Sequence, residues 1–485
     1  MKDNSEKMYD GVTDIRDDLV ENAKTQNIKP PKMKRPWWTA VIAAALVAAI
    51  FAGEMLMPGG TGVNAYAISE ATYPEMAQYP DEYLYMHADG SFDSEGFSAA
   101  FDPWFEDVQA QRRPDGYADG LEAYFKRSTE QFLSGAEGEN VTYSPLNVYM
   151  ALAMFAELTD GESRAQILSL LGAESIEELR QQANDVWNAS YRDDGAVASI
   201  LASSLWLNQD VEFNQETLDT LAENYYASSY SGEMGSDDFN AALQDWLDKQ
   251  TGGLLSDEAG EVELDPETVL ALATTVYFRS KWTSEFNEDN TKTDVFHTAS
   301  GDVDAEFMHA SRSASYYWQE RFSASYMGLE SGGRMWFILP DEGVSADELL
   351  ASGEYMDLVL DPDGWTDQTY IIVNYAVPKF DTSSKFELSD GLKALGVTDV
   401  FDDAVSDFSP MTDMDGIYLS QAEHAVRVAI DEEGVTAAAY TVMASAGTGS
   451  PPEEEVDFTL DRPFIFVVTN PNNVPMFIGI VNNPA

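Results

Sequence analysis

Beyond about residue 115, the hydrophobic positions of the chain follow two kinds of pattern. Apolar residues recur at helical spacing over 121–132 and over 148–171, which predicts helices there. Runs rich in β-branched and aromatic residues predict buried strands at 269–278, 335–340 and 370–380. The mixture of both patterns, without an internal repeat, predicts an α+β fold.

Two apolar runs near the C-terminal end are separated by a short polar segment. PFIFVVTN (463–470) and VPMFIGIVNN (474–483) flank Pro471-Asn472-Asn473. Pro and Asn favour tight turns, and each run is long enough for one strand. The pattern therefore predicts a hairpin of two buried strands.

The apolar run at 37–57 differs from all of these, because Glu54 is its single charged residue. As a helix, 21 residues would extend about 31 Å, enough to cross a bilayer. Basic residues precede the run, and Trp37 and Trp38 stand at its edge. This pattern predicts a transmembrane anchor, with 1–36 in the cytoplasm and the rest of the chain outside the cell.

A cleaved export signal is the alternative to a retained anchor. Ala65-Tyr66-Ala67 fits the small-x-small pattern of a cleavage site, although it lies far beyond the apolar run. The protein is therefore expected at the cell membrane as a single-pass protein, or secreted if the N-terminal segment is cleaved.

The segment 58–114 is rich in acidic residues, Tyr, Pro and Gly, and no sustained period of 2 or 3.6 is found in it. We interpret it as an acidic juxtamembrane spacer that precedes a domain covering 115–485. Its many aromatic side chains would allow it to pack on that domain, since disordered segments are usually poor in aromatic residues.

Charge and composition exclude several functions. With 27 Lys and Arg against 85 Asp and Glu, the net charge of −58 would repel nucleic acid. The chain has no Cys, which excludes disulfides, thiolate nucleophiles and Cys-type zinc sites. Nucleic acid is therefore not an expected partner.

A catalytic centre is not apparent in the sequence either. The four His residues lack the close helical spacing that metal sites usually use, so we expect neither a metal nor another cofactor. The chain contains no G-x-S-x-G elbow, Walker loop or G-x-G-x-x-G; Ser163 in GESRA lacks the second Gly. The pattern does not favour an enzyme.

The most unusual segment is 424–464. After Asp431-Glu432-Glu433, the residues from Gly434 to Ser450 are almost all small or β-branched, without charge or Pro. Such a segment could enter a sheet as a central strand, where Pro would remove a hydrogen bond and an inward charge would be costly. The 14 positions from Val435 to Thr448 would form a strand about 46 Å long.

Over about 115–485 the chain resembles the serpin family. The family's hinge pattern, E-E-G-[TSV]-x-A-A-A-x-T, is matched by residues 432–441, and its C-terminal signature by 461–466 and 477–484, with one extra Asn. Further matches occur in family order at Asn140 with 143–146, 277–278 with 281–282, 378–380, 395–397 with Phe401, and 407–409.

The resemblance implies a serpin fold: a large central sheet A, two further sheets, about eight or nine helices and an exposed reactive-centre loop. It also implies a monomer that inhibits serine-type proteases as a suicide substrate. The protease cuts the loop and forms an acyl-enzyme, and the cut loop inserts into sheet A before the ester is hydrolysed.

Family spacing places the functional residues of the loop. The hinge would comprise Glu433, Gly434, Val435, Thr436, Ala437, Ala438 and Ala439. Counting from Gly434 places the scissile bond at Thr448-Gly449, within a window from Ala446 to Ser450. Because every residue of the window is small, an elastase-like or subtilisin-like protease is the expected target. If Val435 points into the core, Tyr440 falls on the solvent face of the inserted strand.

The resemblance also implies a buried polar cluster beneath the insertion site. The family uses two Ser, one Asn and one His there, and this chain keeps Ser144 and His424 but has Asn147 and Thr274 at the other two positions. We hypothesise a compensated exchange, with the amide moved to Asn147 and the hydroxyl to Thr274. Trp282 is expected near the point where insertion begins.

Two other functions stay open. One is a non-inhibitory serpin-fold binding or adhesion protein at the cell surface; a Pro, a charge or a bulky inward residue within 435–441 would favour it, and that stretch contains none. The other is a surface carbohydrate-binding protein, suggested only by the aromatic and acidic composition.

Overall fold

The computed structural model describes residues 62–87, 91–110, 116–136, 138–253, 260, 262–419, 422–435 and 454–485. These residues form two compact units. The main body comprises Gly62–Met76 and the chain from Gln111 onward, and the helical unit, in its described part, comprises Ala77–Ala110. The expected cytoplasmic segment (1–36) and anchor (37–57) lie outside the described residues. Among the helices that are described, none is long and apolar enough to cross a membrane.

The main body has nine α-helices in its described part, which agrees with the expected eight or nine. They are α4 (Glu122–Leu133), α5 (Pro145–Leu158), α6 (Gly161–Leu171), α7 (Ile176–Ser190), α8 (Gln215–Asn224), α9 (Asp237–Gln250), α11 (Ala346–Ser352), α12 (Glu354–Leu360) and α13 (Ser389–Ala394). Short 3-10 helices are η1 (Val63–Ala65), η3 (Glu288–Asn290) and η4 (Asp399–Phe401).

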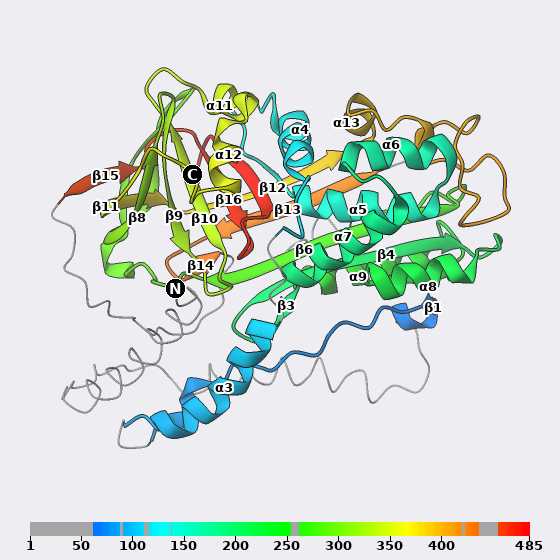
Figure 1. Ribbon diagram of the computed structural model, residues 1–485, viewed down its shortest axis with the longest axis horizontal. Helices are drawn as coiled ribbons and strands as arrows, with labels where there is room; N and C mark the ends of the chain where they lie inside the picture. The colour runs from blue at the N-terminus through cyan, green and yellow to red at the C-terminus, as the bar shows by residue number, and fades with distance from the viewer. Residues whose placement is uncertain are drawn as a thin grey trace, which may run out of the picture. The chain divides into compact units, whose positions relative to one another are not determined.

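Sheet A is the large central sheet, with strand order β1-β5-β4-β6-β14-β13-β12 and β3 paired to β4. Figure 1 shows β4, β6, β13 and β12 extending across the main body. The bounds are β1 (Ala67–Ser69), β3 (Arg192–Asp193), β4 (Ala198–Asn208), β5 (Ala227–Gly232), β6 (Leu270–Lys281), β12 (Phe380–Glu387), β13 (Glu423–Ile430) and β14 (Gly434–Val435).

The remaining strands form one hydrogen-bonded path, β15-β11-β8-β9-β10-β16-β17-β2, with β7 paired to β8. The two further sheets that the sequence predicts are the halves of this path, which we call sheet C (β7, β8, β11, β15) and sheet B (β9, β10, β16, β17, β2). The end of the 18-residue β8 pairs with β9 and joins the halves. The bounds are β2 (Val141–Tyr143), β7 (Lys292–Thr298), β8 (Gly301–Trp318), β9 (Phe322–Gly328), β10 (Arg334–Pro340), β11 (Gln368–Pro378), β15 (Glu455–Thr459), β16 (Phe464–Thr469) and β17 (Pro475–Val481).

The structure confirms the α+β class and the predicted C-terminal hairpin. β16 and β17 pair antiparallel, and Asn473 in their turn has a φ of 63°, a conformation that Asn tolerates well. The single helix expected over 148–171 is wrong, because the chain forms two helices there. α5 ends at Leu158, Thr159 and Asp160 are extended, and Gly161 starts α6 with a φ of 56°.

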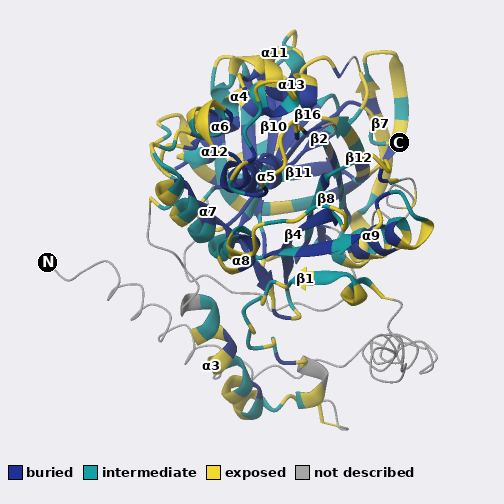
Figure 2. Cartoon of the chain, turned by 90° about the vertical axis from the view of Figure 1, so that its right-hand side faces the viewer, coloured by how far each residue is buried: buried dark blue, intermediate teal, exposed yellow. Residues whose placement is uncertain are grey.

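The alternation of side chains along β4 places helices on both faces of sheet A. Leu201 and Leu205 belong to the main core, which includes α5 and α7, whereas Trp206 packs edge-to-face on Phe239 of α9. Successive side chains of a strand point to opposite faces, so α9 covers the face opposite α5. Every residue of α5 except Ala151 is buried, and Figure 2 shows this helix in the colour of buried residues.

Part of the segment interpreted as a spacer belongs to the main body. β1 pairs with β5 and so lies at the outer edge of sheet A. Tyr73 packs against the rings of Trp187, Tyr191 and Tyr226 at centroid distances of 5.5–6.2 Å. The aromatic packing that the composition suggested therefore occurs, through residues that we assigned to the spacer.

The helical unit contains η2 (Glu82–Tyr85) and α3 (Ser94–Ala110), a helix that the sequence analysis did not predict. Phe97, Phe101 and Trp104 lie at helical spacing and pack against Tyr79, with ring centroids 5.0–6.3 Å away. The helical period is short, and Pro103 interrupts it within the helix, which explains why the pattern was missed.

Candidate functional site

The first residues of the predicted hinge enter sheet A in this structure. Within the two-residue β14, Val435 pairs with Ser280 of β6 on one side and with Ile430 of β13 on the other. Val435 is 1% exposed and belongs to the main core. β14 therefore occupies the first position of a strand between β6 and β13.

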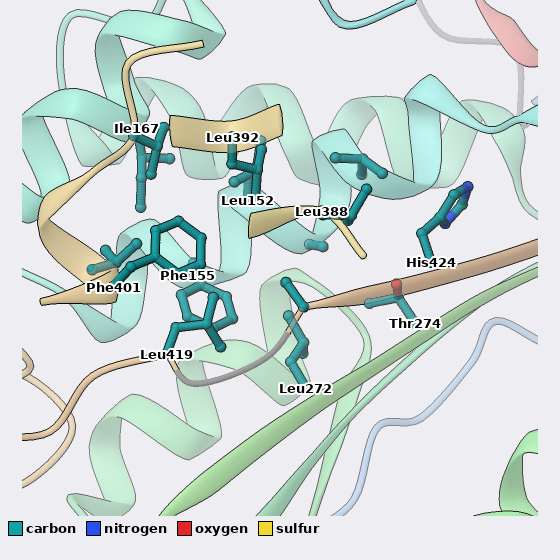
Figure 3. Close-up of a pocket in the computed structure, with 15 residues that line it drawn as sticks. Leu152, Phe155, Ile167, Leu272, Thr274, Leu388, Leu392, Phe401, Leu419 and His424 are labelled. Carbon is teal, nitrogen blue, oxygen red and sulfur yellow. The ribbon is translucent and has the colours of Figure 1, made fainter. Parts of the chain in front are cut away.

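Further along β6 and β13, away from β14, the structure contains a cavity of about 50 Å³. Leu272 and Thr274 of β6, His424 of β13, and apolar side chains of α5 and α13 line it, as Figure 3 shows. We call the space between β6 and β13, including this cavity, the slot. A cavity of this size costs about 1 kcal/mol, so a side chain that fills it would stabilise the sheet.

A tight turn holds the hinge against β6. The Asp431 side chain accepts hydrogen bonds from the main-chain N–H groups of Glu433 (2.9 Å) and Gly434 (3.1 Å). A Cβ atom on Gly434 would lie 2.4 Å from the Ser280 carbonyl oxygen, so a larger residue would push β14 away from β6. Gly is required here by the close approach of two backbones.

Two aromatic residues bind main-chain carbonyl groups of Glu433 and of the two residues before the hinge. The main-chain N–H of Trp282 donates to the main-chain oxygen of Glu433 (3.0 Å). Its indole N–H donates to the main-chain oxygen of Asp431 (2.9 Å). The main-chain N–H of Phe286 donates to the Glu432 oxygen (2.9 Å). The structure thus places Trp282 at the end of the slot that holds β14.

Arg312 of β8 holds the loop from which Phe286 contacts Glu432. Its guanidinium lies 4.9 Å from the centre of the Phe286 ring and donates to the carbonyl oxygens of Ser284 and Glu285, the latter at 2.7 Å. Among the described residues it has no carboxylate partner, and burial lowers its pKa. Its guanidinium also lies 3.7 Å from the Met327 sulfur, and together these contacts of a partly buried cation fix the loop that carries Phe286.

Glu432, directly before the hinge, contacts residues at the ends of neighbouring strands: Thr291 before β7, and Lys379 between β11 and β12. Its carboxylate accepts a hydrogen bond from the Thr291 hydroxyl (2.6 Å) and lies 3.4 Å from the Lys379 ammonium, which also pairs with Glu306 at 3.3 Å. Burial opposes the charge of Glu432, but the Thr291 hydrogen bond and Lys379 lower its pKa overall. Burial likewise opposes the charge of Lys379, yet the two carboxylates raise its pKa.

The structure brings the expected polar cluster together beside the slot. The Ser144 hydroxyl donates to the Met476 oxygen (2.6 Å) and accepts from the main-chain N–H of Asn147 (3.3 Å). The amide of Asn147 lies 3.4 Å from the main-chain oxygen of Thr274 and 3.4 Å from Nδ1 of His424. Ser144, Asn147 and His424 are each at most 3% exposed.

The compensated exchange is only partly present. Asn147 supplies the amide, but it contacts the Thr274 main chain rather than a side chain. The Thr274 side chain lines the cavity, and within the described part of the chain its hydroxyl has no hydrogen-bond partner. Thr274 therefore contributes a carbonyl to the cluster in place of the expected hydroxyl.

The hydrogen bonds of His424 define its tautomer. Its Nε2 accepts from the main-chain N–H of Ser144 at 3.1 Å, so the neutral ring carries its proton on Nδ1. Burial lowers the His424 pKa to about 4, which keeps the ring neutral near pH 7. A protonated Nδ1 is a donor, so it can pair with Asn147 only through the amide oxygen. The Thr274 carbonyl, in contrast, accepts from the amide nitrogen. Asn147 therefore needs a different amide atom for each of the two partners.

The site residues that we predicted fall into three groups. Ser144, Asn147, Thr274 and His424 meet beside the slot. Trp282, Glu433, Gly434 and Val435 meet at its hinge end. The others lie outside the described residues; they are Thr436, Ala437, Ala438, Ala439, Thr448, Gly449 and the window from Ala446 to Ser450.

Sequence reasoning assigned no role to four residues that hold the hinge, namely Thr291, Phe286, Arg312 and Lys379. Lys379 was part of a quoted family match, so a signal for it existed. Arg312 is a lone cation among Ser and Ala, which gives no pattern to detect. Within the described ranges, no group of three or more His, Cys, Asp or Glu side chains could hold a metal ion.

Comparison with known proteins tests the resemblance directly. The family model described as "Serpin (serine protease inhibitor)" matches residues 125–484, which is most of the chain. The chain belongs to the serpin family. Serpins as a family are protease inhibitors rather than catalytic enzymes. The match begins after Gly62–Met76 and the helical unit, so both lie outside the region that the family shares.

Individual relatives agree with this assignment. Serpin-ZX of Arabidopsis thaliana is 28% identical over 377 residues, covering 72% of this chain and 93% of its own length. The native-state crystal structure of tengpin, a thermophilic serpin, has a TM-score of 0.68 at 24% identity and covers 77% of this chain and 95% of its own. Human thyroxine-binding globulin has a TM-score of 0.66 at 20% identity, covering 76% and 98%, and its structure is described as a complex with the hormone. Both solved structures resemble this chain in fold.

Proposed function

We propose that this serpin is a suicide-substrate inhibitor of serine-type proteases, in which the cut loop inserts into the slot as a continuation of β14. The observation that carries the proposal is the position of β14, paired on one side with β6 and on the other with β13. The first hinge residues already occupy the place of a central strand, so insertion needs only to extend it.

Continuing the observed register supports this route. Because Val435 pairs with Ser280 and the strands are antiparallel, each later loop residue would pair with the preceding residue of β6. Ser445 would then pair with Leu270, the last residue of β6 at that end. The proposed window for the scissile bond, Ala446 to Ser450, begins directly beyond. A cut there would release enough chain to fill the slot.

The same register predicts which loop residues face the core. Val435 belongs to the main core, so Ala437, Ala439 and Thr441 would share its face. Their partners on β6 would be Phe278, Val276 and Thr274, which also face the main core or the cavity. Small side chains are suited to that space. Tyr440 would lie on the opposite face, where a large side chain is easier to accommodate.

Hydrogen-bond alternation gives the polar cluster a role in insertion. Trp282 N–H donates to Glu433, so every second residue of β6 from there directs its main chain toward the slot. Thr274 is one of these, and the N–H of Thr441 would donate to its carbonyl oxygen. Asn147 would then be released from Thr274, and its amide oxygen could accept from Nδ1–H of His424. Asn147 would thus supply, until the loop inserts, the hydrogen bond that Thr441 would make in the inserted strand.

The sequence supports a proposal for the target and for the location. The small residues at 446–450 suit a protease with a shallow apolar specificity pocket, elastase-like or subtilisin-like. We place the serpin domain, as a monomer, on the outer face of the cell membrane, held by 37–57, or in the medium if that segment is cleaved.

The second candidate is a non-inhibitory serpin-fold binding protein, whose loop is cut without trapping the protease. The fold likeness to thyroxine-binding globulin, described as a hormone complex, favours keeping it. Incubation with subtilisin and with elastase separates the two candidates. A denaturing gel shows a stable band at the summed mass if the protease is trapped, and only the cleaved serpin if it is not.

Two neighbouring alanines give a matched test of the insertion route. Ala439→Glu would place a charge in the core, whereas Ala438→Glu would place the same charge on the opposite face of the inserted strand. We expect Ala439→Glu to turn the inhibitor into a substrate, and Ala438→Glu to keep most of the trapping. Equal loss of the summed-mass band in both variants would contradict the proposed register.

A further inference from the structure

β12 is the edge strand of sheet A on the side opposite β1, and part of its main chain is unpaired. In an antiparallel pair, every second residue directs its main chain toward the partner strand. The N–H of Leu388 continues the β12–β13 ladder and donates to the Ala422 oxygen at 2.7 Å, so the even-numbered residues of β12 face β13. Asp381 and Ser383 therefore direct their main chain outward. Within the described residues, neither N–H group has a hydrogen-bond partner.

A polar cleft of about 670 Å³ lies beside these two residues. Residues 381–383 of β12, the turn between β7 and β8 (298–300), the segment 138–140 and the C-terminal residues 483 and 485 contribute to its lining. Figure 2 shows β7, β12 and the C-terminal end close together. The volume falls within the usual range for ligand clefts.

The cleft arises because β12 and β8 separate. The N–H of Lys379 donates to the Glu306 oxygen at 2.8 Å and extends the β8–β11 ladder by one pair. Beyond this pair, the described part of β8 pairs only with β7. The N–H of His297 in β7 donates to Asp461 and not to Asp302 opposite, so Asp302 and Glu306 both face away from β7. Two strand edges with unpaired main chain thus leave a wedge, and residues from the far end of each line the cleft.

The walls of the cleft are held in place by hydrogen bonds of their own. The side-chain oxygen of Asn140 accepts from the main-chain N–H groups of Asn482 (2.7 Å) and Asn483 (2.8 Å). The Thr298 hydroxyl donates to the Gly301 oxygen at 2.7 Å and fixes the β7–β8 turn. A bound ligand would therefore lose little free energy in ordering these segments.

The charge of the cleft favours a basic ligand. Glu139 lines it together with Asp381, which is paired with Arg427 at 2.6 Å. In the described part of the chain, no Lys or Arg contributes to the lining. A second copy of this chain would carry the same net charge of −58 and would be repelled, whereas a basic segment would be attracted.

We propose that the free edge of β12 is a docking site for an extended, basic peptide segment of a partner protein, which adds to sheet A as an outer strand within the cleft. An unpaired strand edge is a ready template for such addition. The main chain of Asp381 and Ser383 supplies the hydrogen bonds, and Glu139 selects positive charge. The added strand lies beyond β12, so the slot between β6 and β13 stays free. The proposal does not depend on the inhibitory function.

The test measures the dissociation constant of a fluorescein-labelled peptide by fluorescence anisotropy on the full-length protein. The probe alternates Lys with Val or Thr over about seven residues, which extend about 23 Å as a strand. It should bind more weakly as salt is raised, and a matched peptide with Glu in place of Lys should bind at least about tenfold more weakly. Two versions of the probe, N-methylated on opposite sets of alternate residues, should differ in affinity, because only one set of N–H groups faces β12.

Two substitutions at one position give the matched comparison. Ser383→Pro removes a main-chain donor that faces away from β13, so the β12–β13 ladder stays complete. This variant should weaken binding about tenfold, the effect of one lost hydrogen bond. Ser383→Ala keeps the donor and should bind like the unmodified protein. Glu139→Gln should weaken binding at low salt only.

Hydrogen exchange on the unmodified protein provides a second measurement, which decides the matter if Ser383→Pro folds poorly by urea unfolding. The probe should protect the N–H groups of Asp381 and Ser383 and leave the slot-facing edge of β6 unprotected. Equal binding by a folded Ser383→Pro and Ser383→Ala, or protection of β6 instead of β12, would overturn the proposal.

Self-association is the remaining occupant, and sedimentation without peptide tests it. Dimers that form with rising concentration and disappear in Ser383→Pro would assign the edge to a second copy and overturn the proposal as well. Failure of the inhibitory function would appear as loss of the summed-mass band in the unmodified protein, without any change in peptide binding. The two failures are therefore distinguishable.

Discussion

The side-chain amide of Asn147 lies 3.4 Å from the main-chain oxygen of Thr274, on the edge of β6 that faces the slot. The amide supplies a donor at a point where no described strand pairs with this edge of β6. Asn147→Ala should therefore lower the free energy of unfolding of the uncleaved domain by about 1–2 kcal/mol, because a partly buried carbonyl loses its partner. In the loop-cleaved form the loss should be smaller, since Thr441 would provide the donor. Urea unfolding of both forms measures the difference.

A suitable control for this experiment is Asn188→Ala. Asn188 is a half-buried amide on α7, bonded to the Asn184 carbonyl and far from the slot in sequence. It should affect uncleaved and cleaved forms equally. Stabilisation of the uncleaved form by Asn147→Ser would refute the role given to the amide.

His424 should make stability depend on pH. Its pKa is lowered from 6.5 to about 4 in the folded state, so the unfolded chain binds a proton more readily between these values. The contribution of His424 is complete above about pH 6.5 and is lost as the pH falls toward 4, by a few kcal/mol at most. Urea midpoints from pH 7.5 to 4.5 should fall less steeply for His424→Gln than for the unmodified protein. Parallel profiles would show that the ring is not buried in neutral form.

The ion pair between Glu432 and Lys379 should restrain the hinge. Glu432→Gln can keep the hydrogen bond from Thr291 but loses the attraction to Lys379, worth about 1 kcal/mol for a partly buried pair. We expect faster conversion of the uncut protein to a heat-resistant form, measured by the activity left after warming. Glu306→Gln removes the other carboxylate partner of Lys379 without touching the hinge, and it should convert at nearly the normal rate.

Arg312 should affect the outcome of protease attack more than the stability of the fold. Arg312→Met removes the donors to the Ser284 and Glu285 carbonyls, so Phe286 should hold the hinge less firmly. The ratio of protease released to protease trapped should rise about fivefold, equivalent to roughly 1 kcal/mol. Arg312→Lys keeps the charge but loses the planar fork, and should be intermediate. An unchanged ratio in both variants would limit Arg312 to a structural role.

Tyr73 should contribute to the stability of the main body although it lies outside the shared family region. Tyr73→Ala removes a ring packed against Trp187, Tyr191 and Tyr226, at a cost of about 3 kcal/mol. Thermal unfolding of the main body reports the loss. Tyr79→Ala, which removes a similar ring from the helical unit, should leave that transition in place.

Local patterns were sufficient for much of the fold. β6, β10 and β11 overlap the predicted runs because buried strands need continuous apolar and β-branched residues. The break between α5 and α6 was not visible as a loss of periodicity, since apolar residues continue on both sides of Asp160. β1 has three residues and pairs with β5, more than 150 positions away, so its sequence carries no signal of its own.

The candidate site, like the fold, contains residues that a sequence pattern identifies and residues that no pattern indicates. Ser144, Asn147, Thr274 and His424 were identified through a family pattern and come together in space. Arg312 could not be found that way, because its role arises from contacts with the loop 284–286, which is distant from it in sequence. Asn147 contacts a main-chain oxygen of Thr274, and a residue pattern carries no signal for a contact with the main chain.

One consequence of β14 concerns kinetics. Adding a strand to a sheet is slow mainly because the first pair of residues must lose conformational freedom before later pairs compensate for it. In this protein, Gly434 and Val435 have already passed that nucleation step. Under the proposed function, a cut loop would extend residue by residue from this existing end, so the slowest step of insertion would be complete before the protease attacks.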